Sequence, residues 1–135
     1  MENRQASAIG SLRAVSSAQA TFAASCANGM YAQTLDILGT GPSGGSAFIS
    51  PDLGAAATNV KSGYSVSMTG TSATGTSCTG ATSLASGYHA WADPLSSSTG
   101  TRYFFTNTTG TIWQATSSMS SGSDSATPSG GQVIQ

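Results

Sequence analysis

The fold is decided by residues 2–27, which read ENRQASAIGSLRAVSSAQATFAASCA. This stretch is rich in Ala, contains no Pro and is followed by Asn28-Gly29, so it predicts one long helix that stops near residue 27. At 100° per residue, its apolar side chains fall on a stripe about 140° wide, which predicts the face that packs on the rest of the chain. The stripe consists of Ile9, Leu12, Val15, Phe22, Ala23 and Cys26.

The opposite face of this helix carries small side chains almost exclusively, whereas an exposed helix face usually carries charged residues. Small residues allow another backbone to approach closely, a device that membrane helices also use. We therefore expect this face to pack against copies of the same chain; the alternative is a chain-wide scarcity of charge. The face consists of Ala6, Ser7, Gly10, Ala14, Ser17, Ala18, Thr21 and Ala24, of which we assign Ala6, Ser7, Gly10, Ala14, Ser17 and Thr21 to the interface.

Beyond the helix, the pattern changes to the period of two that is typical of half-buried strands. Tyr64, Val66 and Met68 alternate with polar residues, which predicts a first strand. Further strands are expected at 87–92, 101–106 and 111–115, the last two as a hairpin, with residues 70–83 as loop between the first two strands.

These elements predict one α+β domain over residues 1–135, in which a long N-terminal helix packs on a small antiparallel sheet. The tail has too few apolar residues to build a core of its own. The expected segments are the helix (1–28), a helix-to-sheet loop with short helical turns (29–63), the antiparallel sheet (64–115) and the Ser/Gly-rich tail (116–135).

Charge is scarce in this chain, which has 4 Lys+Arg, 5 Asp+Glu, one His and a formal net charge of -1. Binding to nucleic-acid phosphates needs a basic face, so we expect no nucleic-acid partner. A surface of Ser, Thr, Gly and Asn suits a protein that packs densely against its own copies, and it equally suits an extracellular protein with few charges.

The two cysteines, Cys26 and Cys78, are too few for a zinc site without accompanying His ligands. They are either paired or buried as thiols, and the Ser/Thr-rich, Lys-poor composition of an exported protein favours a disulfide. Such a bond closes a loop of about 50 residues, which contributes on the order of 4 kcal/mol in the chain-entropy model.

No constellation of catalytic residues stands out in the sequence. His89 is the single histidine, and abundant Ser and Thr near it carry little information. The chain has neither a strand–Ser–helix nucleophile motif nor a phosphate-binding loop that ends in Lys-Ser/Thr. We therefore expect no enzymatic activity, no cofactor and no metal site.

Aromatic residues concentrate in the predicted sheet, where the simplest interpretation is a sheet core with cross-strand pairs. The alternative is a patch that binds sugars or surfaces through exposed rings. The set is Tyr88, Trp91, Tyr103, Phe104, Phe105 and Trp113. Asn107-Thr108-Thr109 matches a glycosylation sequon, although Asn is also expected in a hairpin turn.

The order of these features resembles the type IV pilins and the pseudopilins of type II secretion. Residues 2–13 resemble the middle of that family's long helix, and Ala18-Gln19-Ala20-Thr21-Phe22 resembles its small/polar-aromatic run. Residues 29–39 resemble the family's turn after the helix, and residues 88–94, 100–105 and 109–112 resemble the sheet of bacterial pilin-like heads.

This resemblance implies a structural subunit that polymerises into a helical filament on the bacterial cell surface. It also implies that an apolar half-helix precedes Met1 and holds the subunit in the inner membrane before assembly, so that residues 1–28 are the C-terminal half of the long helix. The acidic residues lie too far apart for the calcium loop of major secretion pseudopilins, which favours a pilus subunit. A secretion pseudopilin and an adhesive minor pilin are the alternatives.

Overall fold

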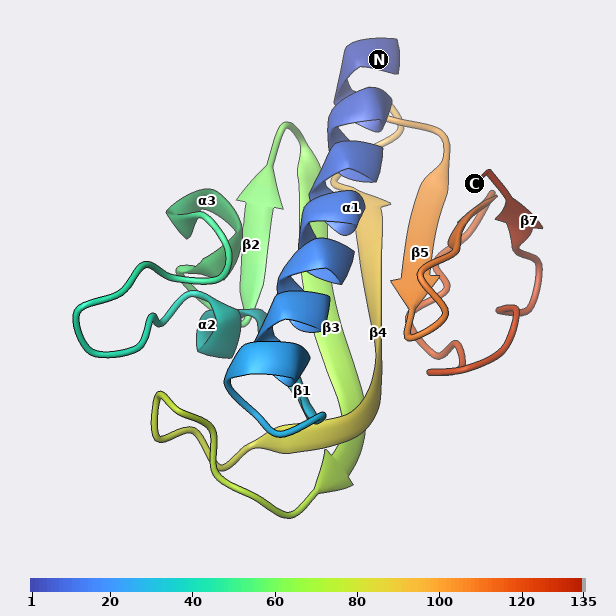
Figure 1. The fold of residues 1–135 in the computed structure, drawn as a ribbon. Helices are drawn as coiled ribbons and strands as arrows, with labels where there is room; N and C mark the ends of the chain where they lie inside the picture. The colour runs from blue at the N-terminus through green and yellow to red at the C-terminus, as the bar shows by residue number, and fades with distance from the viewer. Residues whose placement is uncertain (135) are drawn as a thin grey trace.

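A computed structural model describes residues 1–134 of the protein, in which one long helix lies across one face of an antiparallel sheet (Figure 1). The helix, α1, spans Glu2–Ser25, so the expected helix is confirmed to within two residues. Within residues 1–134, no helix is both long and apolar enough to cross a bilayer. The general α+β architecture predicted from the sequence is therefore correct.

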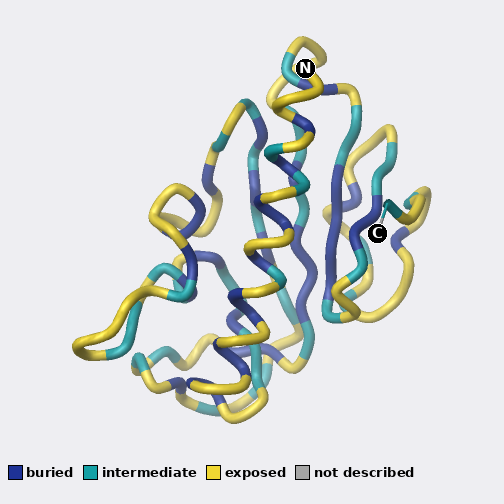
Figure 2. The backbone as a smooth tube through the Cα atoms, turned by 45° about the horizontal axis from the view of Figure 1, so that its top comes forward, coloured by how far each residue is buried: buried dark blue, intermediate teal, exposed yellow. Residues whose placement is uncertain are grey.

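The buried face of α1 differs in part from the apolar stripe. Leu12, Val15 and Phe22 are fully buried as expected, whereas Ile9 at the stripe's edge is only half-buried. Ala18, which we placed on the exposed face, is buried. Figure 2 shows buried and exposed residues alternating along the helix, as expected for a helix with one side on the sheet.

Three polar residues also lie on the buried face: Gln5, Ser11 and Gln19. The Gln19 amide pairs with the backbone of Ala32, donating to its carbonyl at 2.8 Å and accepting from its N–H at 2.9 Å. Gln19 thus satisfies the N–H and the carbonyl of Ala32, which removes the penalty of burying these two backbone groups. An apolar pattern misses such residues because it counts Gln as exposed.

Across residues 1–134 the sheet has seven strands, and all of their pairings are antiparallel. The main path runs β2-β3-β4-β5-β6-β7, and β1 pairs with β4. Two short helices, α2 and α3, lie between β1 and β2 in the chain. The bounds are β1 Tyr31–Ala32, α2 Leu35–Leu38, α3 Pro51–Gly54, β2 Thr58–Lys61, β3 Tyr64–Ala73, β4 Leu84–Pro94, β5 Tyr103–Asn107, β6 Ile112–Ala115 and β7 Gln132–Val133.

The structure corrects three boundaries of the predicted segments. Residues 29–63 are not only loop and helical turns, because they contain β1 and β2. β3 continues to Ala73, so the start of the expected 70–83 loop is strand. The tail contributes β7, which pairs with β6. β1, β2 and β7 are short, and the last residues of β3 are mostly polar. These segments therefore lack the apolar alternation by which the sequence would predict a strand.

The short helices α2 and α3 pack through a contact between two glycines. A Cβ on Gly39 would lie 2.0 Å from the Gly54 carbonyl oxygen, and a Cβ on Gly54 would lie 2.7 Å from the Gly39 Cα. Neither position has room for a side chain, so these glycines are retained for close backbone approach.

The expected disulfide is present between Cys26 and Cys78. The bond joins the residue after α1 to the loop between β3 and β4, as the sequence predicted. The Cys78 N–H also donates to the Cys26 carbonyl at 2.7 Å, so the backbone and the disulfide join the same two segments.

Side chains alternate between two separate cores on the two faces of the sheet. The larger core lies under α1 and includes Phe22, Tyr64 and Phe104. The smaller core, on the opposite face, consists of Phe105, Trp113 and Met119, and Met119 comes from the tail. The tail buries Met119 and Pro128 within residues 116–134, and it contributes Met119 to the core on the second face of the sheet.

Candidate functional site

The exposed face of α1 is the first candidate site, and we call it the small-residue face. Ala6, Gly10, Ala14, Ser17 and Thr21 are all exposed. The sixth member, Ser7, is half-buried, and its hydroxyl donates to the Ser62 hydroxyl at 3.1 Å. The six residues that we assigned to an interface therefore lie on one side of α1, without Ala18, which is buried against the sheet.

Gly10 has no packing role within the described chain. A Cβ at this position would meet no atom within 4 Å outside its own helix and neighbours. Gly in a helix interior is about 1 kcal/mol less favourable than Ala. The fold of one chain therefore gives no reason for Gly at position 10.

Two hollows flank the small-residue face. One, of about 470 Å³, lies between α1 and residues 46–50, with Ala14, Ser17 and Thr21 in its wall. The other, of about 450 Å³, lies between α1 and the β5–β6 turn, where Ser16 and Gly110 contribute to its wall. The exposed side of α1 thus lies between two grooves, and either groove can receive the side-chain ridge of another helix.

His89 is the second candidate, because the structure places it in a buried polar cluster with the tail. Its Nδ1 lies 2.7 Å from Asp124 Oδ1, and its Nε2 lies 2.8 Å from the Ser120 carbonyl oxygen. Its ring stacks on Trp91 and Phe105, with centroids 5.3 and 5.5 Å away. His89 and Trp91 therefore share one face of β4.

This geometry gives His89 a structural role. A carbonyl oxygen can only accept a hydrogen bond, so Nε2 donates to Ser120 and has no lone pair for a nucleophile's proton. Partial burial raises the pKa of Asp124, but hydrogen bonds from His89 and Thr71 outweigh it and hold that pKa below its ordinary value. The cluster thus binds the tail to the sheet through an ionised carboxylate.

A second carboxylate, Asp93, lies under the tail in a less favourable environment. Its Oδ2 accepts a hydrogen bond from the Ser118 hydroxyl at 2.6 Å, whereas its Oδ1 is buried without a partner in residues 1–134. Desolvation raises the pKa of Asp93, and the bond from Ser118 offsets this only in part.

The aromatic set does not form one surface. Four of its members, Tyr88, Phe104, Phe105 and Trp113, are buried, which supports the sheet-core interpretation for them. The other two, Trp91 and Tyr103, are half-buried and pack against Phe105 and Trp113 in the smaller core, whereas Tyr88 and Phe104 belong to the larger core on the other face of the sheet.

The sequon at Asn107 is not accessible in this fold. Asn107 is fully buried, and its amide nitrogen donates to the carbonyls of Ser123 and Ala126 at 3.0 and 2.9 Å. The residue therefore anchors the tail, and a glycan could not be attached without releasing it. Within residues 1–134, no three His, Cys, Asp or Glu side chains come close enough to hold a metal ion.

No family model, no curated protein and no solved structure matches this chain. The function is therefore argued from the helix face, the polar clusters and the surface hollows alone.

Proposed function

We propose that the chain is a structural subunit of an extracellular type IV pilus-like filament, which polymerises by packing of its helices. The proposal is carried by the small-residue face of α1, an exposed helix surface with two flanking grooves and a glycine that its own fold does not require. Such a surface allows two helix backbones to approach closely.

The arrangement of the elements supports the same proposal. The long helix comes first in the chain and packs on an antiparallel sheet, the order found in pilin-like heads, and its first turns extend beyond the sheet (Figure 1). The disulfide suits a protein that matures in an oxidising compartment. We accordingly place the subunit on the bacterial cell surface, with an inner-membrane anchor before assembly.

The experiment compares folding with assembly in the full-length protein and its head domain. Ala14→Trp should change the free energy of unfolding by about 0.5 kcal/mol or less, because Ala14 is exposed. Cells that carry it should nevertheless yield few sheared filaments, because the indole holds neighbouring helices apart. Ala57→Trp, at an exposed position away from α1, is the matched control and should leave filaments unchanged.

Phe22→Ala supplies the opposite case. Phe22 is fully buried, so its truncation should destabilise the head by about 3–5 kcal/mol. Normal filament yield from Ala14→Trp cells would contradict the proposal. So would an Ala14→Trp head that melts as early as the Phe22→Ala head, because the face would then be part of the fold.

A second candidate function is an adhesive minor subunit at a filament tip. It is favoured by one observation, a hollow at the start of β5 that is lined by Arg102, for which residues 1–134 supply no ion-pair partner. The abundance of the subunit separates the two candidates, because a structural subunit dominates sheared filaments whereas a tip subunit is rare in them.

A further inference from the structure

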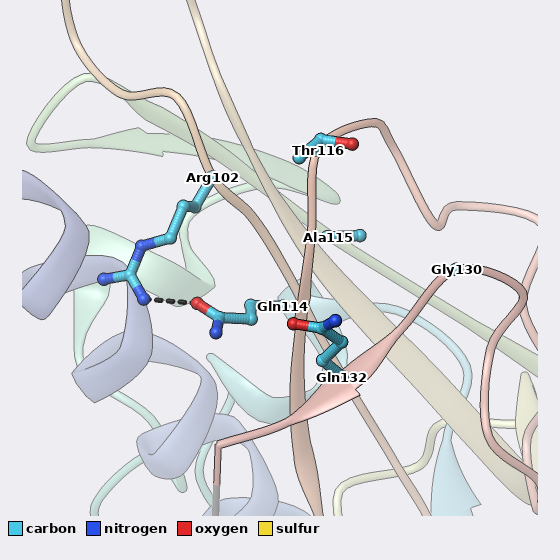
Figure 3. A pocket seen from close by; sticks show the side chains of 6 residues that line it. All are labelled: Arg102, Gln114, Ala115, Thr116, Gly130 and Gln132. Atoms are coloured by element: carbon cyan, nitrogen blue, oxygen red, sulfur yellow. Dashed lines mark hydrogen bonds between the residues drawn. The ribbon is translucent and has the colours of Figure 1, made fainter.

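A hollow of about 290 Å³ opens where β5 begins and β6 ends (Figure 3). This volume lies near the lower end of ligand pockets and suits a ligand with the size of one ring. Polar side chains and small residues line it together. The lining is Arg102, Gln114, Ala115, Thr116, Gly130 and Gln132.

Arg102 supplies a charge to this hollow that no described carboxylate neutralises. Its Nη1 donates to Gln114 Oε1, and its guanidinium lies 5.1 Å from the centre of the Phe104 ring. The ion pairs that the structure records within residues 1–134 involve other residues. These two contacts orient the guanidinium in advance, so the Arg102 side chain loses little conformational entropy when an anion binds.

Two amides continue the polar wall beside the guanidinium. Gln114 and Gln132 are register partners across β6 and β7, and Figure 3 shows their side chains next to each other. Gln114 uses its oxygen for Arg102, which leaves its NH2 group as a donor. The Gln132 side chain has no hydrogen bond to any described residue. Together with the Thr116 hydroxyl, these groups can both donate to and accept from ligand hydroxyls.

We propose that this hollow binds an acidic saccharide, with the carboxylate of a uronic acid on Arg102 and its ring hydroxyls on the amides of Gln114 and Gln132. A guanidinium fork matches a carboxylate in a bidentate pair. A phosphate dianion fits less well, because only one cation lines the hollow. The neutral donors and acceptors next to Arg102 can bind the hydroxyl groups of a sugar ring. A ligand that is only a carboxylate would leave these groups unused.

The test measures binding to the whole chain with glucuronate and galacturonate as probes. Glucose, galactose, acetate and inorganic phosphate are the comparison ligands. Titrations are followed by the side-chain amide NMR signals of Gln114 and Gln132 and by calorimetry. The uronates should bind with a dissociation constant on the order of 1 mM, as expected for a small ligand in a shallow site. They should bind at least about tenfold more tightly than every comparison ligand, because only they engage both the arginine and the amides.

Three variants locate the site. Arg102→Gln should weaken uronate binding about tenfold or more, as loss of a charge-assisted hydrogen bond predicts. Gln132→Ala should weaken it about threefold while leaving the fold intact, because that side chain is exposed and has no described partner. Lys61→Gln makes the same change in charge on the opposite edge of the sheet and should leave binding unchanged.

Each other outcome would overturn the proposal. Acetate binding as tight as uronate binding would mean that only a carboxylate is recognised, and tighter phosphate binding would mean a general anion site. Uronate binding that survives Arg102→Gln in a folded variant would place the ligand elsewhere. Absence of uronate binding would exclude the site. It would leave the helix-packing proposal unaffected, because that proposal is tested by a separate measurement, the yield of sheared filaments.

Discussion

Gly10→Ala tests whether the glycine on the small-residue face has any role in the single chain. The added methyl group meets no atom within 4 Å, so it introduces no clash. The helix propensity of Ala over Gly should then raise the free energy of unfolding by about 0.8–1.0 kcal/mol. For a domain of 135 residues this corresponds to an increase in Tm of about 3 °C.

The assay is a thermal melt and a urea titration of the purified chain, with an inverse variant as the control. Ala20 is also exposed on α1, so Ala20→Gly should lower stability by about the same amount. The two positions are about 15 Å apart along the helix, so the double variant should melt close to the wild type.

A Tm for Gly10→Ala at or below that of the wild type would refute this reasoning, because it would show that Gly10 has a packing or conformational role in the monomer. A stabilised monomer that also assembles fewer filaments would show that Gly10 is retained for close contact between subunits. The same stabilisation with normal assembly would favour the scarcity of charged residues as the reason for small side chains here.

Three further predictions concern the disulfide and two half-buried carboxylates. Replacing Cys26 and Cys78 together by Ser should lower the free energy of unfolding, measured by urea denaturation, by about 4 kcal/mol. Non-reduced peptide mapping of the wild type should find the two cysteines linked. Two free thiols in protein from an oxidising compartment would contradict this prediction. Asp93→Asn should raise the Tm at pH 7, and the gain should shrink as the pH falls through the raised pKa of Asp93, because the wild-type carboxyl is then neutral in the folded state. Asp124→Asn should lower the Tm at pH 7, and its Tm should approach that of the wild type as the pH falls below 3.8, because folding lowers the pKa of Asp124. If thermal melts across this pH range showed the same trend for both Asp variants, they would contradict the two pKa assignments.

The candidate interface could be predicted from the sequence because exposure on an isolated helix follows its periodicity. Gly10, Ala14 and Thr21 lie opposite Leu12, Val15 and Phe22 in any regular helix, and the structure keeps them exposed. Ala18 was misplaced because it lies near the border of the two faces, where the width of the sheet decides burial. The Arg102 hollow could not be predicted, since it joins β5, β6 and the tail, which lie apart in the sequence.

The sequence by itself determined the long helix, the α+β class, the hairpin of β5 and β6 and the disulfide. Each of these depends on local periodicity, on turn residues or on the presence of only two cysteines. Only the tertiary structure decided the position of the tail and the role of Gln19. Both depend on hydrogen bonds between distant segments, such as Gln19 to Ala32 and Asp124 to His89. Such bonds stabilise polar residues in buried positions. Hydrophobic patterning assigns polar residues to the surface, so it cannot predict these bonds.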